Sequence, residues 1–351
     1  MKVDFIIVGQ GLAGTLLANE LIRLGKLVVV FDDPDQPKAS GVAAGLINPV
    51  VFRRMTKSWM LDDVFPVMET TYRQLENLLH ESFYFPAPIY RIFVEKEVAS
   101  WKEKVRTNRL ESYLEAEPEM NFRNKKLSVQ HGTGLVKKAG RLEIQKLISA
   151  FSAYLAEHKL LRKEKFHIEK LLINSGTVSY DDLQAEKIIF CEGPAAAQNP
   201  YFSRLKFKPS KGEILELSIP ELELNEIISR EIFVMPLGGN RYKVGATYSW
   251  DDLNQQITES AREELLGKLK TIVQAEPEIL QQKAGIRPTM HDRKPVIGVL
   301  PGFQQIGIFI GLGSKGALWG PFFALQFARY ICEISGEIHP EASIQRYFRK
   351  K

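Results

Sequence analysis

Apolar residues at the start of the chain follow first a strand pattern and then a helical one. Residues 3–8 (VDFIIV) form a short β-branched run that predicts a buried strand. From Leu12 to Leu24 the apolar side chains recur on one helical stripe, which Gly25 ends. Residues 27–32 (LVVVFD) predict a second buried strand. Together these segments predict a β-α-β unit, and therefore parallel strands in a sheet that is covered on both faces.

In the middle of the chain, strand and helix patterns no longer alternate regularly. Segment 84–134 mixes short strand patterns with charged helical stretches. Helical spacing returns at 141–158, and strand patterns follow at 166–173 and 187–191. This change of pattern indicates that the first domain is interrupted.

Between residues 207 and 250 the hydrophobic period becomes two. Leu215, Leu217 and Ile219 alternate with polar residues, which is typical of a strand with one buried face. Further along, two apolar runs flank a Gly-Gly-Asn turn at 238–240, and this arrangement predicts a β-hairpin.

The C-terminal part returns to the first pattern, with a strand predicted at 306–311 and a helix at 316–334. We therefore expect one discontinuous α/β domain and a second, β-rich domain inserted twice between its pieces. The pieces expected for the α/β domain are 1–60, 135–206 and 285–351. Those expected for the inserted domain are 61–134 and 207–284.

The composition is that of a globular protein and does not by itself indicate a nucleic-acid-binding or membrane-spanning protein. The 351 residues are 44% hydrophobic and 25% charged, as in an ordinary globular enzyme. A net charge of +5 is a mild excess that does not by itself indicate nucleic-acid binding. No stretch reaches the roughly 18 apolar residues that a membrane span needs, and the N-terminus does not resemble a signal peptide. We expect a cytoplasmic protein with no membrane span.

The number of cysteines and the spacing of histidines predict neither a disulfide framework nor a metal site. Cys191 and Cys332 are too few for a disulfide framework and fit a reducing compartment. No two of the six histidines have metal-ligand spacing, so no metal site is expected. His291 is interpreted as a loop or core residue rather than a base.

A glycine-rich segment, GQGLAG, lies between the first predicted strand and helix. Gly9 permits the tight turn, Gly11 lets the backbone approach a pyrophosphate, and Gly14 allows close packing of helix on strand. The helix N-terminus supplies amides and the positive end of its dipole. Asp32 closes the second strand, where its carboxylate can accept hydrogen bonds from ribose hydroxyls. This pattern predicts a bound dinucleotide but does not separate FAD from NAD, so a nicotinamide-dependent dehydrogenase stays an alternative.

Residues 39–49 (ASGVAAGLINP) form a segment of small residues whose backbone could lie against a large flat ligand. Other short segments accompany it along nearly the whole chain: 188–193 (IIFCEG), 209–215 (PSKGEIL), 244–247 (VGAT), 284–288 (AGIRP), 295–298 (PVIG) and 311–316 (GLGSKG). With these segments, in this order, the chain resembles the D-amino-acid oxidase superfamily of FAD-dependent oxidoreductases. The similarity is to the glycine oxidase and sarcosine oxidase branch.

The resemblance implies an α/β plus α+β fold, with a discontinuous Rossmann-like FAD-binding domain and an inserted β-sheet substrate domain. It also implies non-covalent FAD, with the start of the last helix near the flavin edge where negative charge develops on reduction. The family usually has Ala at the position of Cys191. The cofactor contacts implied by the resemblance are Gly9, Gly11, Leu12, Ala13, Gly14, Asp32, Ser40, Ala44, Gly45, Leu46, Ile168, Cys191, Gly193, Gly313, Ser314, Lys315 and Gly316.

For the substrate, the resemblance implies that Arg287 binds a carboxylate, because a guanidinium offers paired donors that match a carboxylate fork. Phe233 stands where relatives usually have a substrate-binding Tyr, and its lack of a hydroxyl weakens the expectation of a simple free amino acid as substrate. The alternative is that the register differs and another residue, such as Tyr248 or Tyr242, takes over. No catalytic acid or base is assigned, since hydride transfer needs placement more than a base. The expected reaction is oxidation of the C–N bond of an amino acid or N-substituted glycine, by an oxidase or a dehydrogenase.

The segments ASG…AGL, DRKP and GLGSKG also resemble the oxidase domain of the bifunctional tRNA wobble-uridine modification enzyme. That resemblance implies, as an alternative, oxidation of a carboxymethylaminomethyl side chain on tRNA. Residues 52–59 (FRRMTKSW) interleave three cations with two aromatics, which could contact phosphates and bases. The other interpretation of this octapeptide is a solvated face that packs its aromatics inward. A non-catalytic protein with an FAD fold is the last alternative.

Overall fold

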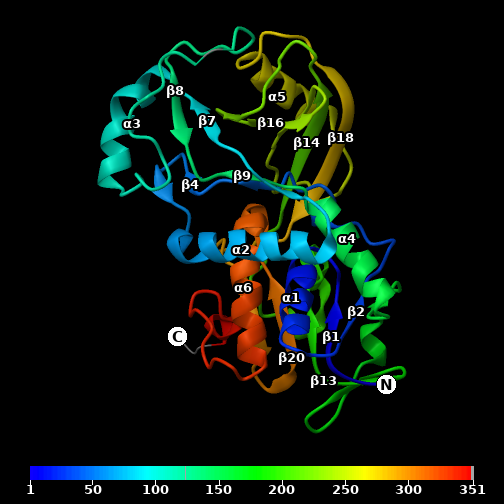
Figure 1. The fold of residues 1–351 in the computed structure, drawn as a ribbon. Helices are drawn as coiled ribbons and strands as arrows, with labels where there is room; N and C mark the ends of the chain where they lie inside the picture. The colour runs from blue at the N-terminus through cyan, green and yellow to red at the C-terminus, as the bar shows by residue number, and fades with distance from the viewer. Residues whose placement is uncertain (123, 349–351) are drawn as a thin grey trace.

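The computed structural model describes residues 1–122 and 124–348, which form two large sheets and two small ones, with helices around them. In Figure 1 a sheet containing β1, β2, β13 and β20 lies in the lower half, beside helices α1, α4 and α6. A second sheet, with β7, β8, β14, β16 and β18, lies in the upper half next to α3 and α5. The chain passes between the two halves several times, as the discontinuous pattern in the sequence predicts.

The N-terminal β-α-β unit is confirmed. Strand β1 (Lys2–Val8) and strand β2 (Val28–Phe31) pair in parallel, and helix α1 (Leu12–Arg23) connects them in the sequence. All four residues of β2 are buried, because helices cover one face and a second apolar cluster covers the other. Strand β1 also pairs in parallel with β13 (Leu183–Phe190), so the loop after β1 lies at the carboxyl edge of the sheet.

The first sheet has the order β10-β2-β1-β13-β12-β11, with β20 paired to β13 and β19 paired to β20. Its helices are α1, α4 (Ile144–Glu157) and α6 (Gly316–Ile331). Its remaining strands are β10 (Leu161–Arg162), β11 (Leu172–Ile173), β12 (Val178–Tyr180), β19 (Val296–Leu300) and β20 (Phe303–Ile310).

The second sheet has the order β18-β14-β17-β16-β15-β7-β8. Helices α3 (Glu95–Thr107) and α5 (Glu259–Lys270) accompany it. Its strands are β7 (Ile89–Ile92), β8 (Thr133–Val136), β14 (Ser210–Ser218), β15 (Ile227–Ser229), β16 (Phe233–Gly238), β17 (Arg241–Gly245) and β18 (Glu278–Arg287). Short strands β3 (Leu46–Ile47), β6 (Tyr84–Pro86) and β9 (Gly140–Leu142) form a third sheet, and β4 (Val50–Val51) pairs with β5 (Thr56–Lys57). The predicted hairpin is present as β16 and β17.

The strand predicted over 166–173 is largely wrong. Residues 168–170 form a short 3-10 helix, and only Leu172 and Ile173 join a sheet. An apolar residue of this segment packs in the core without pairing as a strand. The ring of Phe166 packs at 5.4 Å from Phe31 and 4.1 Å from Tyr180, centroid to centroid, so it fills the core without joining a ladder.

Helix α2 (Leu61–Leu79) forms where the apolar pattern predicts no element. It packs against α6, and the buried Tyr72 hydroxyl donates a hydrogen bond of 2.7 Å to the Ala317 carbonyl in the first turn of α6. The helix therefore holds the start of α6 in position. The domain boundary at residue 60 stays a prediction.

Candidate active site

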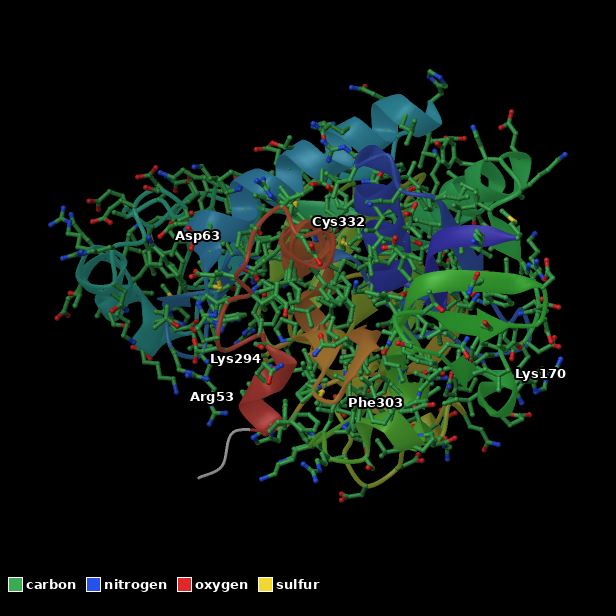
Figure 2. All side chains as sticks on the ribbon, turned by 90° about the horizontal axis from the view of Figure 1, so that it is seen from below. Arg53, Asp63, Lys170, Lys294, Phe303 and Cys332 are labelled. Atoms are coloured by element: carbon green, nitrogen blue, oxygen red, sulfur yellow. The ribbon has the colours of Figure 1, made fainter. Side chains whose placement is uncertain are left out.

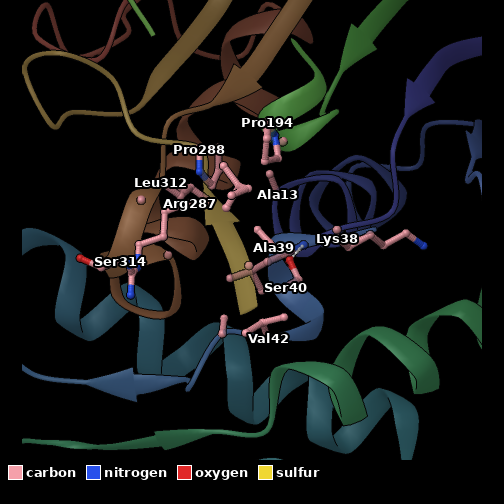
Figure 3. Close-up of a pocket in the computed structure, with 18 of the residues that line it drawn as sticks. Ala13, Lys38, Ala39, Ser40, Val42, Pro194, Arg287, Pro288, Leu312 and Ser314 are labelled. Atoms are coloured by element: carbon pink, nitrogen blue, oxygen red, sulfur yellow. Dashed lines mark hydrogen bonds between the residues drawn. The ribbon is translucent and has the colours of Figure 1, made fainter. Parts of the chain in front are cut away.

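A cavity of about 1380 Å³ lies between the two sheets and takes its walls from both. Small-molecule sites usually have roughly 300–1,000 Å³, so this one has room for a large ligand and a second molecule. Figure 3 shows Arg287 and Ser314 on one side of the cavity and Lys38 and Ser40 on the other. Residues far apart in the sequence therefore meet around one space.

The residues predicted to bind the cofactor come together here. All of them except Gly14 line the cavity, and so do Arg287 and Phe233. Gly14 lies behind the first glycine loop, where a Cβ would lie 1.9 Å from the Gly9 carbonyl oxygen. Its position fits the close packing of helix on strand that the sequence predicts.

The loop after β1 requires a glycine at position 9. Gly9 has a φ of +98°, and a Cβ there would lie 2.7 Å from the Cys191 carbonyl oxygen. Gly11 precedes the first residue of α1, and the Leu12 amide donates a hydrogen bond of 3.1 Å to the Ser40 hydroxyl. The bare backbone and the helix N-terminus thus face the cavity, as an anion-binding turn does.

Asp32 is held in one orientation at the end of β2. Its Oδ1 accepts from the Gln10 amide at 3.0 Å, and its Oδ2 accepts from the Lys38 ammonium at 2.6 Å. A carboxylate oxygen can accept more than one hydrogen bond, so both oxygens can also accept from ribose hydroxyls. Lys38 is not among the residues predicted from the sequence, because a lone lysine in a loop gives no signal for this role.

The opposite wall begins with the turn Gly313–Lys315, which leads into α6. The Lys315 ammonium donates to the Asn48 carbonyl at 2.6 Å and to the Ser58 hydroxyl at 2.9 Å. No carboxylate of the described residues pairs with it, and burial lowers the pKa of Lys315 to about 8. An anionic group in the cavity would favour the charged lysine, because opposite charges stabilise each other. The residues present therefore fit an anionic dinucleotide.

Arg287, the last residue of β18, lies flat against Gly212 of β14. Its Nη1 donates to the Lys211 carbonyl at 3.1 Å and its Nη2 to the Thr247 carbonyl at 3.2 Å. A Cβ on Gly212 would lie 1.9 Å from Nη2. The Tyr248 ring covers the guanidinium, with Cζ 4.0 Å from the ring centroid. Within the part of the chain that the structure describes, Arg287 has no carboxylate partner, so its charge is available to a ligand.

The structure separates the two tyrosines considered as substitutes for Phe233. Tyr242 is buried in the second sheet, where its hydroxyl accepts from the Leu224 amide at 3.1 Å. Tyr248 is 53% exposed and lines the cavity beside Arg287. Phe233 also lines the cavity and offers only an apolar ring. Of the two tyrosines, only Tyr248 has a hydroxyl at the site.

The two aromatic residues of the octapeptide 52–59 lie in different surroundings. Trp59 packs against Trp319 and Phe323, with centroids 5.7 and 5.4 Å away. Phe52 is partly buried and lines the cavity. Arg53 and Arg54 are exposed, and Figure 2 shows Arg53 at the surface. The inward packing of Trp59 agrees with a solvated face rather than with two aromatics that stack on bases.

Neither Cys191 nor His291 offers an acid or base to the site. Burial raises the pKa of the Cys191 thiol far above its ordinary range, so the group stays neutral beside the cavity. His291 is exposed and lies 3.4 Å from the Tyr347 hydroxyl, away from the cavity wall. In residues 1–122 and 124–348, no cluster of potential metal ligands was found, and no helix is both long and apolar enough to cross a membrane.

Comparison with known proteins gives a family match over almost the whole chain. A family described as FAD dependent oxidoreductase matches residues 4–330. An uncharacterized oxidoreductase, YurR of Bacillus subtilis, is 23% identical over 93% of this chain and 94% of its own length. Glycine oxidase of Bacillus licheniformis is 23% identical over 91% of this chain and 90% of its own length.

Another group of relatives is longer. The tRNA 5-methylaminomethyl-2-thiouridine biosynthesis bifunctional protein MnmC of Marinobacter nauticus is 27% identical over 43% of this chain. Its counterpart in Hahella chejuensis is 25% identical over 91% of this chain. The matches cover 26% and 55% of the lengths of these two proteins.

Solved structures show the same fold. Glycine oxidase from Bacillus cereus superposes with a TM-score of 0.79 at 21% identity, over 95% of this chain and 96% of that one. Iminodiacetate oxidase from Chelativorans superposes with a TM-score of 0.77 at 19% identity, over 98% of both chains. The two-sheet architecture around the cavity is therefore that of known flavoenzymes.

Proposed function

Since the chain belongs to the family of FAD-dependent oxidoreductases that includes glycine oxidase, we propose that it oxidises the C–N bond of a carboxylate-bearing amine. The substrate class is an amino acid or an N-substituted glycine. FAD, the cofactor of this family, supplies a hydride acceptor when it is bound.

The dinucleotide would be held by the glycine loop, Asp32 and the start of α6. The backbone of the glycine loop and the N-terminal end of α1 would face the pyrophosphate, and Asp32 would accept from the ribose. Lys315 and the N-terminal end of α6 lie where negative charge on the ligand is stabilised. Each contact uses a group that the protein already holds in place.

The observation that carries the substrate proposal is the guanidinium of Arg287. It lines the cavity, is fixed by two backbone carbonyls, and has no carboxylate partner in the described chain. A substrate carboxylate would form the charge-assisted, paired hydrogen bonds that such a group favours. An amine without a carboxylate would leave the positive charge of Arg287 without a partner.

Apolar side chains in the cavity wall would favour the neutral form of the substrate amine. Ile214, Phe233 and Ile286 line this part of the cavity and are apolar. A substrate amine held beside them loses water, which favours its neutral form because burial disfavours charge. Loss of a hydride from the adjacent carbon requires this neutral form. Water then hydrolyses the imine that results.

A spectroscopic experiment tests the proposal. The purified protein should carry FAD and should bleach anaerobically with at least one of glycine, sarcosine and iminodiacetate. Methylamine and benzylamine, which lack the carboxylate, serve as controls and should leave the flavin oxidised. Bleaching by the controls alone would contradict the role of Arg287.

A second candidate is oxidation of a carboxymethylaminomethyl group on tRNA, whose carboxylate would also bind to Arg287. It is supported by similarity to the tRNA-modifying bifunctional proteins and by Arg53, which is exposed and also lines the cavity. The inward packing of Trp59 weighs against it. We therefore rank the small-molecule oxidase first.

A further inference from the structure

Two large aromatic side chains are exposed next to the substrate side of the cavity. Tyr248 is 53% exposed and Trp250 is 50% exposed. Their rings stack with centroids 6.1 Å apart and planes 24° apart. One residue, Ser249, separates them, and in extended backbone side chains two positions apart point to the same side. The sequence Tyr-Ser-Trp therefore places both rings on one face.

The segment that carries these rings is firmly held. The backbone of Ser249 exchanges two hydrogen bonds with Lys211, of 2.8 and 3.0 Å. Two residues beyond Trp250, Asp252 accepts from the buried Lys211 ammonium at 2.7 Å, and Asn254 accepts from it at 2.9 Å. The loop is thus tied to β14 on both sides of Trp250. Rings fixed in this way lose little conformational freedom when a ligand binds.

The aromatic pair continues directly from the carboxylate site. Tyr248 lies over Arg287 with Cζ 4.0 Å from the ring centroid, and it lines the cavity. Trp250 stacks on Tyr248 and does not line the cavity itself, so it lies further toward solvent. A substrate whose carboxylate is on Arg287 can extend its other end along these rings.

Single exposed aromatics are common on protein surfaces, but adjacent ones beside a site mark binding surfaces. We propose that Tyr248 and Trp250 determine specificity by stacking on a planar ring that the substrate carries on its amine nitrogen. The preferred substrate is an N-substituted glycine with an aromatic or heteroaromatic substituent. This inference rests on the proposed oxidation of carboxylate-bearing amines.

The experiment compares ligands with and without a ring. (Benzylthio)acetate and (methylthio)acetate keep the carboxylate and replace the amine nitrogen by sulfur, so they bind without being oxidised. Their dissociation constants come from the shift in the flavin absorbance of the holoenzyme. The ring-bearing ligand should bind about tenfold more tightly, the size expected of one aromatic stacking contact. N-benzylglycine should exceed sarcosine by a similar factor in kcat/KM.

Variants assign the preference to the rings. Trp250→Ala should bring the ratio of the two dissociation constants close to one, and Trp250→Phe should keep most of the preference. Leu253→Ala is the matched control, because Leu253 is also exposed, at 42%, in the same loop and carries no ring. It should leave the ratio unchanged.

The outcomes separate the two proposals. If amines are oxidised but the two thioacetates bind equally, the stacking proposal is wrong and the proposed function stands. The stacking proposal is also wrong if Trp250→Ala and Leu253→Ala behave alike. If no carboxylate-bearing amine bleaches the flavin and neither thioacetate shifts its spectrum, both proposals fail.

Discussion

Gly212 shows how much the substrate site depends on a residue without a side chain. A Cβ there would overlap Arg287, lying 1.9 Å from Nη2 and 2.2 Å from Cζ. We expect Gly212→Ala to displace the guanidinium and to weaken binding of (methylthio)acetate at least tenfold, with FAD content unchanged. Equilibrium titration of the flavin absorbance measures this. Gly267→Ala, in α5 with open space around the new methyl group, is the control. Equal affinities in the two variants would contradict the packing argument.

Arg287 itself allows a more direct test. Replacing it with Ala should cost about 2–5 kcal/mol of substrate binding, because the substrate carboxylate would have no buried charge to pair with. Lys should restore only part of this, since an ammonium cannot make the paired contact of a guanidinium. Steady-state kinetics on an established substrate measure both variants. Unchanged kinetics in Arg287→Ala would remove the carboxylate assignment.

Lys315 gives a pH dependence with a definite sign. Burial lowers the pKa of Lys315 to about 8 in the folded protein, whereas an unfolded lysine has a pKa of about 10.4. Between these values the unfolded chain binds more protons, so the free energy of unfolding should rise as the pH increases from about 8 to 10. Below pH 8 Lys315 is charged in both states, and the cost of burying its charge lowers the free energy of unfolding by its full amount.

The Lys315→Met variant isolates this contribution. Denaturant unfolding of wild type and variant, both freed of FAD, at pH 8 and pH 10 should show that the variant lacks part of this increase in the free energy of unfolding. If the two proteins change in parallel with pH, the lysine has an ordinary pKa in the folded state.

Among the helices, α6 depends on α2 for the position of its first turn. Tyr72→Phe would leave the Ala317 carbonyl without its donor in a buried setting. We expect a loss of about 1–2 kcal/mol in the free energy of unfolding. Tyr330→Phe removes a hydroxyl from the same helix, α6, where the side chain is only half-buried, and should change stability by much less. Similar losses in both variants would argue against a specific role for the hydrogen bond.

The elements that the sequence predicts well are continuous apolar segments with clear boundaries. The first strand is a short apolar run, and the first and last helices are longer apolar segments that begin at glycine-rich turns, so their type and place follow from length and boundary residues. Segment 166–173 fails because Phe166 is apolar for packing against Phe31 and Tyr180, not for pairing. A pattern records burial, and several backbone conformations can bury the same side chain.

For the whole chain, the cofactor half of the site was more predictable than the substrate half. Gly9, Gly11 and Asp32 fall within one β-α-β unit, whose local geometry fixes their relation. Arg287 and Tyr248 come from different strands and loops, and only the fold places one over the other. Tyr248 and Tyr242 could not be told apart by sequence, since only the fold buries Tyr242 in the core and places Tyr248 in the loop after β17, beside Arg287.

The charge of the whole molecule bears on the tRNA alternative. If tRNA is bound, affinity in a filter-binding titration should fall steeply with salt. Arg53→Ala with Arg54→Ala should then reduce the log–log slope by about one unit for each phosphate that the protein no longer neutralises. Lys170→Ala, at an exposed lysine that pairs with Asp181, is the control. Absence of binding at low salt, or an unchanged slope in the arginine variants, leaves the small-molecule oxidase.

The walls of the dinucleotide site are joined by bonds within the protein itself. Asp32 accepts from Gln10, Ser40 accepts from Leu12, and a lysine ties the turn before α6 to the loop at Asn48. Each link joins segments that are separated in the sequence, so the protein's own hydrogen bonds position the walls of the site. FAD bound between these walls would stabilise the folded state by mass action, as does any ligand that binds only the folded form. The free energy of unfolding should therefore rise with the concentration of FAD.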